Sequence, residues 1–232
     1  MKMKIIHILC EGQTEQGFVE NVLKPYLVAN GVVAVKSVLV FTSRKENARG
    51  GVVSFLKVKN DLSIMMKSNK DNDSEIHIFT TMFDFYALPG DFPGYEGTQC
   101  KTNKYERVAA IETAFADCIG SDRFIPYIQL HEFETLVLCG LDYLKDMYKG
   151  RNKQIDCLKA ELNKVGNPEL VNDKPETAPS KRIIKAVEGG NKKLYNYDKP
   201  KSGRDVTQNV GIDELRARCR HFDAWVVKLL SV

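Results

Sequence analysis

The chain has 232 residues, enough for one large domain or for one domain plus a small appendage, and its content of 43% hydrophobic and 28% charged residues is typical of a soluble globular protein. No apolar run approaches the roughly 18 residues that a membrane helix needs, which argues against a membrane partner and favours a cytoplasmic protein. The six cysteines have neither the short spacing nor the neighbouring histidines of a zinc site, so we expect reduced thiols.

Strands and helices alternate along the first 140 residues. The pattern predicts strands over 4–10, 32–41, 75–83 and 124–130, with helices over 15–27, 52–67 and 105–118. Pro25 is expected to bend or end the first helix. The Pro- and Gly-rich stretch 86–102 predicts a long loop. This order predicts an α/β fold with a mostly parallel central sheet and flanking helices.

The strand signal disappears after about Gly140. Helices are expected over 141–148, 154–165, 180–188 and 212–230, with a loop over 192–210. We therefore predict an α/β core over 1–140 and a C-terminal helical annex, packed on that core, over 141–232.

Acidic residues follow three of the predicted strands. Glu11 follows the first strand and Asp84 the third, and Glu132 and Glu134 come after the fourth. Glu15 lies one helical turn beyond Glu11, on the same face. Ligands of open parallel sheets bind beyond the carboxyl ends of the strands, and a hard divalent cation relieves repulsion between carboxylates. The pattern therefore predicts a Mg²⁺ or Mn²⁺ site.

Each of these acids also has a purely structural interpretation. Glu11 could be a solvated loop acid, Glu15 an acid that suits the helix dipole, and Asp84 a turn residue or cap. For Glu132 and Glu134, an extended backbone would point both carboxylates to one side. If the segment opens a helix, the two diverge and only one can bind the metal. The sequence does not choose between these alternatives.

The segment from Lys174 to Arg204 carries a net charge of +6, whereas the rest of the chain sums to −2. We expect it to face the same rim as the carboxylates and to attract a polyanion. A phosphate site is predicted at a helix start, with Ser180 as the cap and Lys181, Arg182 and Lys185 as cations. Lys181 or Arg182 could also stabilise the transition state of phosphoryl transfer. The alternative is a solvated, lysine-rich surface.

Several of these motifs together resemble a bacterial family of unknown function, number 4276 of the domain-of-unknown-function series, which is placed among Toprim-like folds. The matching pieces span nearly the whole chain: Glu11-Gly12-x-Thr14-Glu15, Met82-Phe83-Asp84-Phe85-Tyr86, His131-Glu132-Phe133-Glu134, Pro179-Ser180-Lys181-Arg182 and Cys219-x-His221-Phe222-x-x-Trp225. The resemblance implies a Toprim-like domain related to the overcoming-lysogenization-defect nucleases. It also implies Mg²⁺, a DNA or RNA substrate, and a possible ABC-type ATPase partner in phage defence.

One motif departs from the Toprim pattern. Toprim domains use an early Glu and a later Asp-x-Asp, whereas this chain has Asp84-Phe85-Tyr86. Asp91, or the pair Glu132 and Glu134, could replace the second Asp, although Asp91 could also cap its own turn. We therefore expect a Mg²⁺-dependent nuclease or a related phosphodiester-processing enzyme. The alternative is a non-catalytic Toprim-like module that binds nucleic acid or a partner protein.

Overall fold

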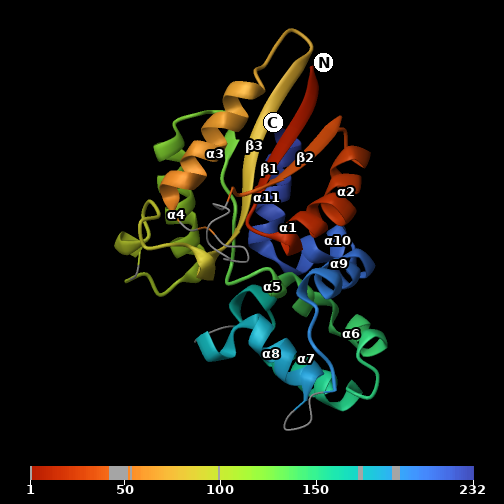
Figure 1. Cartoon of the computed structure of the whole chain (residues 1–232). Helices are drawn as coiled ribbons and strands as arrows, with labels where there is room; N and C mark the ends of the chain where they lie inside the picture. The colour runs from red at the N-terminus through yellow and green to blue at the C-terminus, as the bar shows by residue number, and fades with distance from the viewer. Residues whose placement is uncertain (1, 42–51, 53, 99, 172–174, 190–193) are drawn as a thin grey trace.

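The computed structural model describes residues 2–41, 52, 54–98, 100–171, 175–189 and 194–232. Its sheet has the strand order β2-β1-β3-β4, with β5 also pairing with β3, and every pair is parallel. The strands are β1 (Met3–Cys10), β2 (Ala34–Leu39), β3 (Glu75–Asp84), β4 (Phe124–Ile125) and β5 (Ile128–Gln129). The parallel sheet with flanking helices confirms the predicted α/β class (Figure 1).

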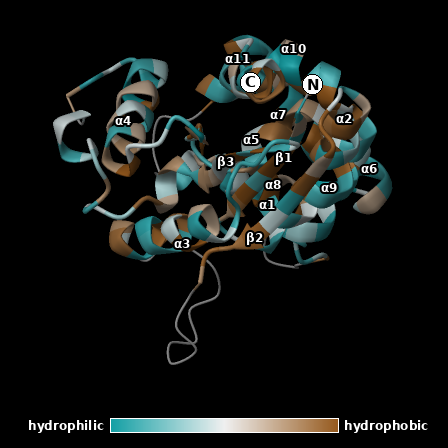
Figure 2. Cartoon of the chain, turned by 90° about the horizontal axis from the view of Figure 1, so that it is seen from above, coloured by the Kyte–Doolittle hydropathy of each residue, from teal (hydrophilic) through white to brown (hydrophobic). Residues whose placement is uncertain are grey.

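Strand β1 lies inside the sheet and is apolar on both faces. Ile6, Ile8, Leu9 and Cys10 are fully buried, as expected for a strand covered by helices on both sides. Helices α3 (Phe55–Ser68) and α4 (Lys104–Ile119) cover the face that includes Leu9. Helix α11 (Arg220–Ser231) and the first helix of the chain (Gln13–Ala29) cover the other face, so the strands lie between two hydrophobic layers (Figure 2).

The first helix runs without interruption from Gln13 to Ala29, so of the two predicted effects of Pro25, bending or ending the helix, the second is wrong. It consists of α1 (Gln13–Phe18), a π-helical turn (Val19–Leu23) and α2 (Lys24–Ala29). Pro25 lies directly after the π-helical turn, in the first turn of α2. Because proline has no N–H to donate, this local change in hydrogen-bond spacing lets the helix continue past it.

The predicted strand over 124–130 is divided into β4 and β5. Pro126 lies between them and has no amide donor for the ladder. Strand β4 pairs with Phe79 and Thr80, and β5 pairs with Phe83 and Asp84. The division is therefore a correction of the sequence prediction, but both pieces still run toward the carboxyl end of β3.

The remaining helices follow β5. They are α5 (Glu134–Val137), α6 (Leu141–Met147), α7 (Asn152–Val165), α8 (Pro179–Glu188), α9 (Lys199–Val210), α10 (Ile212–Arg218) and α11 (Arg220–Ser231). Short 3-10 turns lie at Phe85–Ala87, Glu96–Thr98, Leu138–Gly140, Pro168–Leu170 and Pro175–Thr177. Helix α9 replaces part of a predicted loop, and the predicted last helix is broken at Cys219, which has an extended backbone. Among these described helices, none has the length and apolar character that crossing a membrane requires.

Helix α11 packs directly on the sheet. The Trp225 indole donates to the Thr80 hydroxyl over 2.9 Å and stacks on Tyr127 with ring centroids 4.1 Å apart. The Lys4 ammonium group donates to the Leu230 carbonyl over 2.9 Å. The helices after residue 140 thus share one hydrophobic core with β1, while α6, α7 and α8 lie beyond the carboxyl end of the sheet (Figure 1). The domain boundary at 140 stays a prediction.

Candidate metal centre at the carboxyl end of the sheet

Glu11 and Asp84 lie side by side where two neighbouring strands end. Cys10 of β1 pairs with Met82 of β3, and the Glu11 amide donates to the Met82 carbonyl over 3.1 Å. The Asp84 amide donates to Glu11 Oε2 over 2.9 Å. This bond fixes the Glu11 carboxylate beside Asp84, so the strand ends bring together two of the five acids that the sequence singled out.

Asp84 is at the centre of a group of carboxylates. Burial raises the pKa of Asp84 well above its ordinary value, and its Oδ1 atom is buried with no hydrogen-bond donor among the described residues. Neighbouring negative charges raise the pKa further, in the order Glu15, Glu11, Glu134 and Glu132. Burial also raises the pKa of Glu11 to about 7, against the opposing effect of the Asp84 amide. The charged form of this cluster is thus costly without a cation.

Glu15 belongs to this group and also caps its own helix. The Gly12 amide donates to Glu15 Oε2 over 2.9 Å, the one half of a capping box that a glycine at the start of α1 allows. Glu15 is buried, and burial is the main cause of its raised pKa. Glu15 can therefore be both a helix cap and a metal ligand, because one of its oxygens accepts the Gly12 amide while its negative charge raises the pKa of Asp84.

The segment His131–Glu134 directs its two glutamates to different partners. Phe133 has helical angles, φ −50° and ψ −37°, so the segment opens a helix and is not extended. Glu132 accepts hydrogen bonds from the Ser180 amide and from the Ser180 hydroxyl, the latter over 3.0 Å. Glu134 is 2% exposed, and its Oε1 atom lies 3.1 Å from the Lys199 ammonium group and accepts no backbone amide of the described residues. This geometry favours Glu134 over Glu132 as a metal ligand.

Lys199 supplies the positive charge nearest to this cluster. Its Nζ atom lies 3.1 Å from Glu134 Oε1 and 3.9 Å from Glu132 Oε2. Burial lowers the pKa of Lys199, but the carboxylates outweigh that effect and the pKa is raised. Burial likewise raises the pKa of Glu134 to about 7, and Lys199 opposes that shift. Within the described residues, no three His, Cys, Asp or Glu side chains already form a metal-binding group, so metal binding requires the carboxylates to move closer together.

Sequence reasoning did not single out Lys199, because it lay in a predicted loop. Signals for the helix start were nonetheless present. Asp198 caps α9 by accepting a bond from the Lys201 amide over 3.1 Å, and Pro200 occupies its first turn. An Asp followed closely by Pro is a recognised helix-start pattern. Recognising it would have predicted a helix beginning at Lys199.

Gly203 lets α9 approach α5 closely enough to bring Lys199 to the carboxylates. A Cβ atom at Gly203 would lie 2.7 Å from Phe133 Cε1. We expect Gly203→Ala to lower the free energy of unfolding by about 1–3 kcal/mol, because the packed ring must shift. Gly17→Ala in α1 is the control, since nothing lies within 4 Å of the added atom there. Urea unfolding of both variants measures the difference, and equal stabilities would contradict the close-packing argument.

Tyr86 and His131 connect the two segments that carry the acids. The Tyr86 hydroxyl lies 2.9 Å from His131 Nδ1, and the Tyr86 amide donates to the His131 carbonyl over 3.0 Å. His131 has a φ of 65°, a left-handed conformation that is strained for a residue other than glycine. Its Nε2 atom lies 3.0 Å from the Glu169 carbonyl. The left-handed conformation of His131 is therefore held by contacts at both ring nitrogens, and it fixes the position of the next residue, Glu132.

The Asp91 side chain lies beside the first residue of α3, Phe55. Both of its carboxylate oxygens accept the Phe55 amide, over 3.2 and 3.1 Å. Asp91 thus satisfies an amide in the first turn of another element and does not cap its own turn. It is not among the acids that raise the pKa of Asp84. That Asp91 is an extra metal ligand stays a prediction. Its hydrogen bonds with the Phe55 amide give it a structural role at the start of α3.

The predicted basic segment divides between two surfaces. Lys199 faces the carboxylates, whereas Lys181, Arg182 and Lys185 line a cavity between α7 and α8. Lys174, Lys192 and Lys193 lie outside the described residues. Ser180 is not the cap, because Ala178 occupies that position. Since the Ser180 amide and hydroxyl both donate to Glu132, they are already engaged, which corrects the prediction that Ser180 binds a phosphate at this helix start.

A parallel sheet with buried carboxylates beyond its strand ends defines an α/β protein with an acidic site at the sheet edge. The family described as Domain of unknown function (DUF4276) matches residues 10–230. The chain therefore belongs to this family, as the sequence motifs indicated.

Comparison with solved structures gives a match to the C-terminal region of the Burkholderia pseudomallei OLD protein. The similarity covers 97% of this chain and 98% of that chain, with 13% sequence identity and a TM-score of 0.43. Comparison with curated proteins gives no match.

Proposed function

We propose that the carboxylate cluster binds Mg²⁺ or Mn²⁺ and that the protein hydrolyses phosphodiester bonds in DNA or RNA. The observation that carries the proposal is the burial of Asp84 Oδ1, which lacks a hydrogen-bond donor among the described residues and lies among the charges of Glu11, Glu15 and Glu134. Oxygen atoms of this kind are costly unless a cation or a proton satisfies them. The donor set consists of carboxylate oxygens, the ligands that hard divalent cations prefer.

Glu11, Asp84 and Glu134 would hold the metal, with Glu15 as a further carboxylate beside them. When bound, the ion would neutralise phosphate charge and lower the pKa of a coordinated water. Lys199 carries a positive charge at the same site, so it can contact a phosphate oxygen as its pairing with Glu134 weakens. Glu132 stays bonded to Ser180, which anchors the start of α8 beside the cluster.

Hydrolysis assays on single- and double-stranded DNA and RNA test this function directly. We expect cleavage in Mg²⁺ or Mn²⁺, loss of cleavage in EDTA, and loss in Glu11→Gln, because that side chain loses its charge beside Asp84. Asp117→Asn, which removes an exposed acid of α4, is the control and should keep full activity. Equal cleavage by the two variants would assign any activity to a contaminant and reject the proposed site.

The stability of the metal-free protein is expected to fall as the pH rises from about 4.5 to above 7. The pKa values of Glu11 and Glu134 are raised to about 7 in the folded chain, from the ordinary 4.5. The folded state therefore holds more protons than the unfolded state in this window, and stability declines with pH. Thermal unfolding in EDTA should show this decline.

Added Mn²⁺ should offset the decline, so its stabilising effect is expected to be larger at pH 8 than at pH 5.5. The double variant Glu11→Gln/Glu134→Gln should show a flatter pH dependence and a smaller effect of Mn²⁺. An unchanged pH dependence in that variant would contradict the assigned pKa values.

One observation favours a non-catalytic module instead. The described side chains form no assembled metal-binding group, and Lys199 already pairs with Glu134. In this alternative Lys199 neutralises the cluster permanently, and the protein binds nucleic acid or a partner, with an ABC-type ATPase as the partner to test. Absence of any Mn²⁺-induced thermal shift, together with stable co-purification of such an ATPase, would support it.

A further inference from the structure

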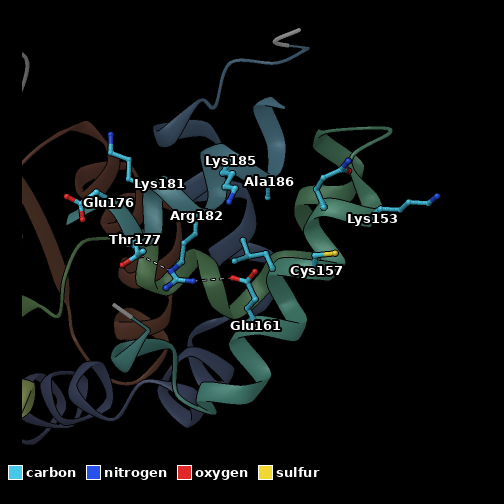
Figure 3. Close-up of a pocket in the computed structure, with 11 residues that line it drawn as sticks. Lys153, Cys157, Glu161, Glu176, Thr177, Lys181, Arg182, Lys185 and Ala186 are labelled. Carbon is cyan, nitrogen blue, oxygen red and sulfur yellow. Dashed lines mark hydrogen bonds and ion pairs between the residues drawn. The ribbon is translucent and has the colours of Figure 1, made fainter. Parts of the chain in front are cut away.

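A cavity of about 360 Å³ lies between α7 and α8, and four cationic side chains line it (Figure 3). We call it the α7–α8 groove, and its cations are Lys153, Lys181, Arg182 and Lys185. We propose that this groove binds the phosphates of a polynucleotide next to the bond that the carboxylate site cleaves. The inference rests on the proposed function for that cleavage, but its binding step can be tested separately.

The charges in the groove point to an anionic ligand. Glu161 and Glu176 also line it, and Arg182 pairs with Glu161 over 3.2 Å. The three lysines are exposed, and no carboxylate of the described residues forms an ion pair with them. The cations therefore exceed the acids, and the groove carries a positive charge that its own side chains do not neutralise.

The positions of the lysines on α8 are unfavourable in the absence of a ligand. Lys181 lies in the first turn of α8, where a positive charge opposes the helix dipole. Lys181 and Lys185 are four residues apart, so two like charges lie on one face of the helix. A bound phosphate removes both penalties, which is the electrostatic argument for an anion.

The groove begins where the carboxylate cluster ends. Ser180, the residue before Lys181, donates from its hydroxyl to Glu132 over 3.0 Å. Since an α-helix rises ~1.5 Å per residue, Lys185 lies about 7.5 Å along α8 from Ser180. One helix thus connects the cluster to the groove, and a nucleic-acid chain with one phosphate at the cluster can place neighbouring phosphates on the lysines.

The groove also has an apolar wall. Leu158 of α7 and Ala186 of α8 are buried at its base, and Cys157 is exposed within it. Cations beside an apolar surface suit a polynucleotide, because its phosphates can contact the cations while its sugar or base faces contact the apolar surface. A free phosphate would use only the cations, so the two ligands can be distinguished by experiment.

Protection of Cys157 tests the location without any substitution. The protein is alkylated in a buffer that contains Ca²⁺, with and without a single-stranded oligonucleotide. Peptide mass spectrometry then measures the extent of alkylation at each cysteine. Cys118 of α4 is also exposed and is the internal control. We expect several-fold protection of Cys157 and none of Cys118. Equal protection of Cys157 by AMP would define a mononucleotide site and overturn the inference, as would no protection.

A charge-matched pair of variants tests the phosphate contacts. Lys181→Ala/Lys185→Ala removes two cations of the groove, and Lys59→Ala/Lys67→Ala removes two exposed cations of α3, on the other face of the sheet. We expect the first variant alone to bind the oligonucleotide about tenfold more weakly, with a log–log salt slope smaller by about 1.4. Equal affinities and slopes in the two variants would overturn the inference.

The metal site is monitored in the same variants by the Mn²⁺-induced thermal shift. We expect the shift in the wild type and in both double variants, because none of the four lysines pairs with a carboxylate of the cluster. If Lys181→Ala/Lys185→Ala has the smaller salt slope but the wild type shows no Mn²⁺ shift, the groove is supported and the proposed function is rejected. If the wild type shows the Mn²⁺ shift but the slope of that variant is unchanged, the proposed function is supported and the groove is rejected.

Discussion

Asp84→Asn should abolish metal-dependent hydrolysis and, at the same time, raise the unfolding temperature of the metal-free protein. Activity should fall about a thousandfold or more, since the central ligand contributes several kcal/mol of charge stabilisation. Stability should rise because the Asp84 carboxylate is buried among other acids and its pKa is raised well above the ordinary value. Ionising it at pH 8 therefore costs folding free energy that asparagine does not incur.

The measurements are hydrolysis in Mn²⁺ and thermal unfolding at pH 8, with and without EDTA. Mn²⁺ should stabilise the wild type but not Asp84→Asn, so the order of their unfolding temperatures should reverse when metal is added. Asp117→Asn, on the exposed side of α4, should behave as the wild type in both assays. A less stable Asp84→Asn protein in EDTA would show that Asp84 is a structural turn residue.

Lys199→Met should destabilise the metal-free protein by about 1–3 kcal/mol at pH 8, because it leaves the Glu134 carboxylate buried without its cation. This magnitude is below that of a fully buried pair, since the Lys199 side chain is 44% exposed and solvent screens part of its charge. Adding Glu134→Gln to Lys199→Met should restore most of the lost stability, since no unpaired charge remains.

Urea unfolding of the wild type, both single variants and the double variant gives the coupling energy between the two side chains. Hydrolysis should be lost in all three variants, whereas the Mn²⁺ thermal shift should persist in Lys199→Met and weaken in Glu134→Gln. If the two single changes in the free energy of unfolding sum to that of the double variant, the contact between Lys199 and Glu134 does not contribute to stability. A lost Mn²⁺ shift in Lys199→Met would show that Lys199 organises the site before metal binds.

Glu11 and Asp84 were predictable as strand-end acids because each follows a mostly apolar, buried run. Ile5, Ile6, Ile8 and Leu9 precede Glu11, and buried residues of β3 precede Asp84. Parallel pairing then brings the two strand ends together whatever the details of the helices. Proximity of Glu11 and Asp84 thus follows from hydrophobic patterning alone.

Helix α9 was not predictable from the same signal, because it has no apolar stripe. Its buried residues include Ser202, Gly203 and Thr207, which are small or polar, with Val206 the apolar exception. Such a face packs closely but shows no hydrophobic period of 3.6 residues. The contact between Lys199 and Glu134 depends on this helix, so it needed tertiary information.

The divergence of Glu132 and Glu134 had a different cause. Both an extended and a helical backbone fitted Leu136, Val137 and Leu138, and the left-handed conformation of His131 decides between them. Local sequence does not specify that conformation, because a histidine adopts it only where its surroundings hold it. Tyr86 and Glu169, which supply those surroundings, are distant along the chain.

The contact between Tyr86 and His131 has an evolutionary consequence. It joins the segment after Asp84 to the segment before Glu132 by one side-chain contact and one backbone bond. Loss of either side chain breaks the same contact, so a change at position 86 costs less once His131 has been replaced. Across the family these two positions should therefore substitute together, and correlated replacement at 86 and 131 would mark the lineages that have rebuilt this junction.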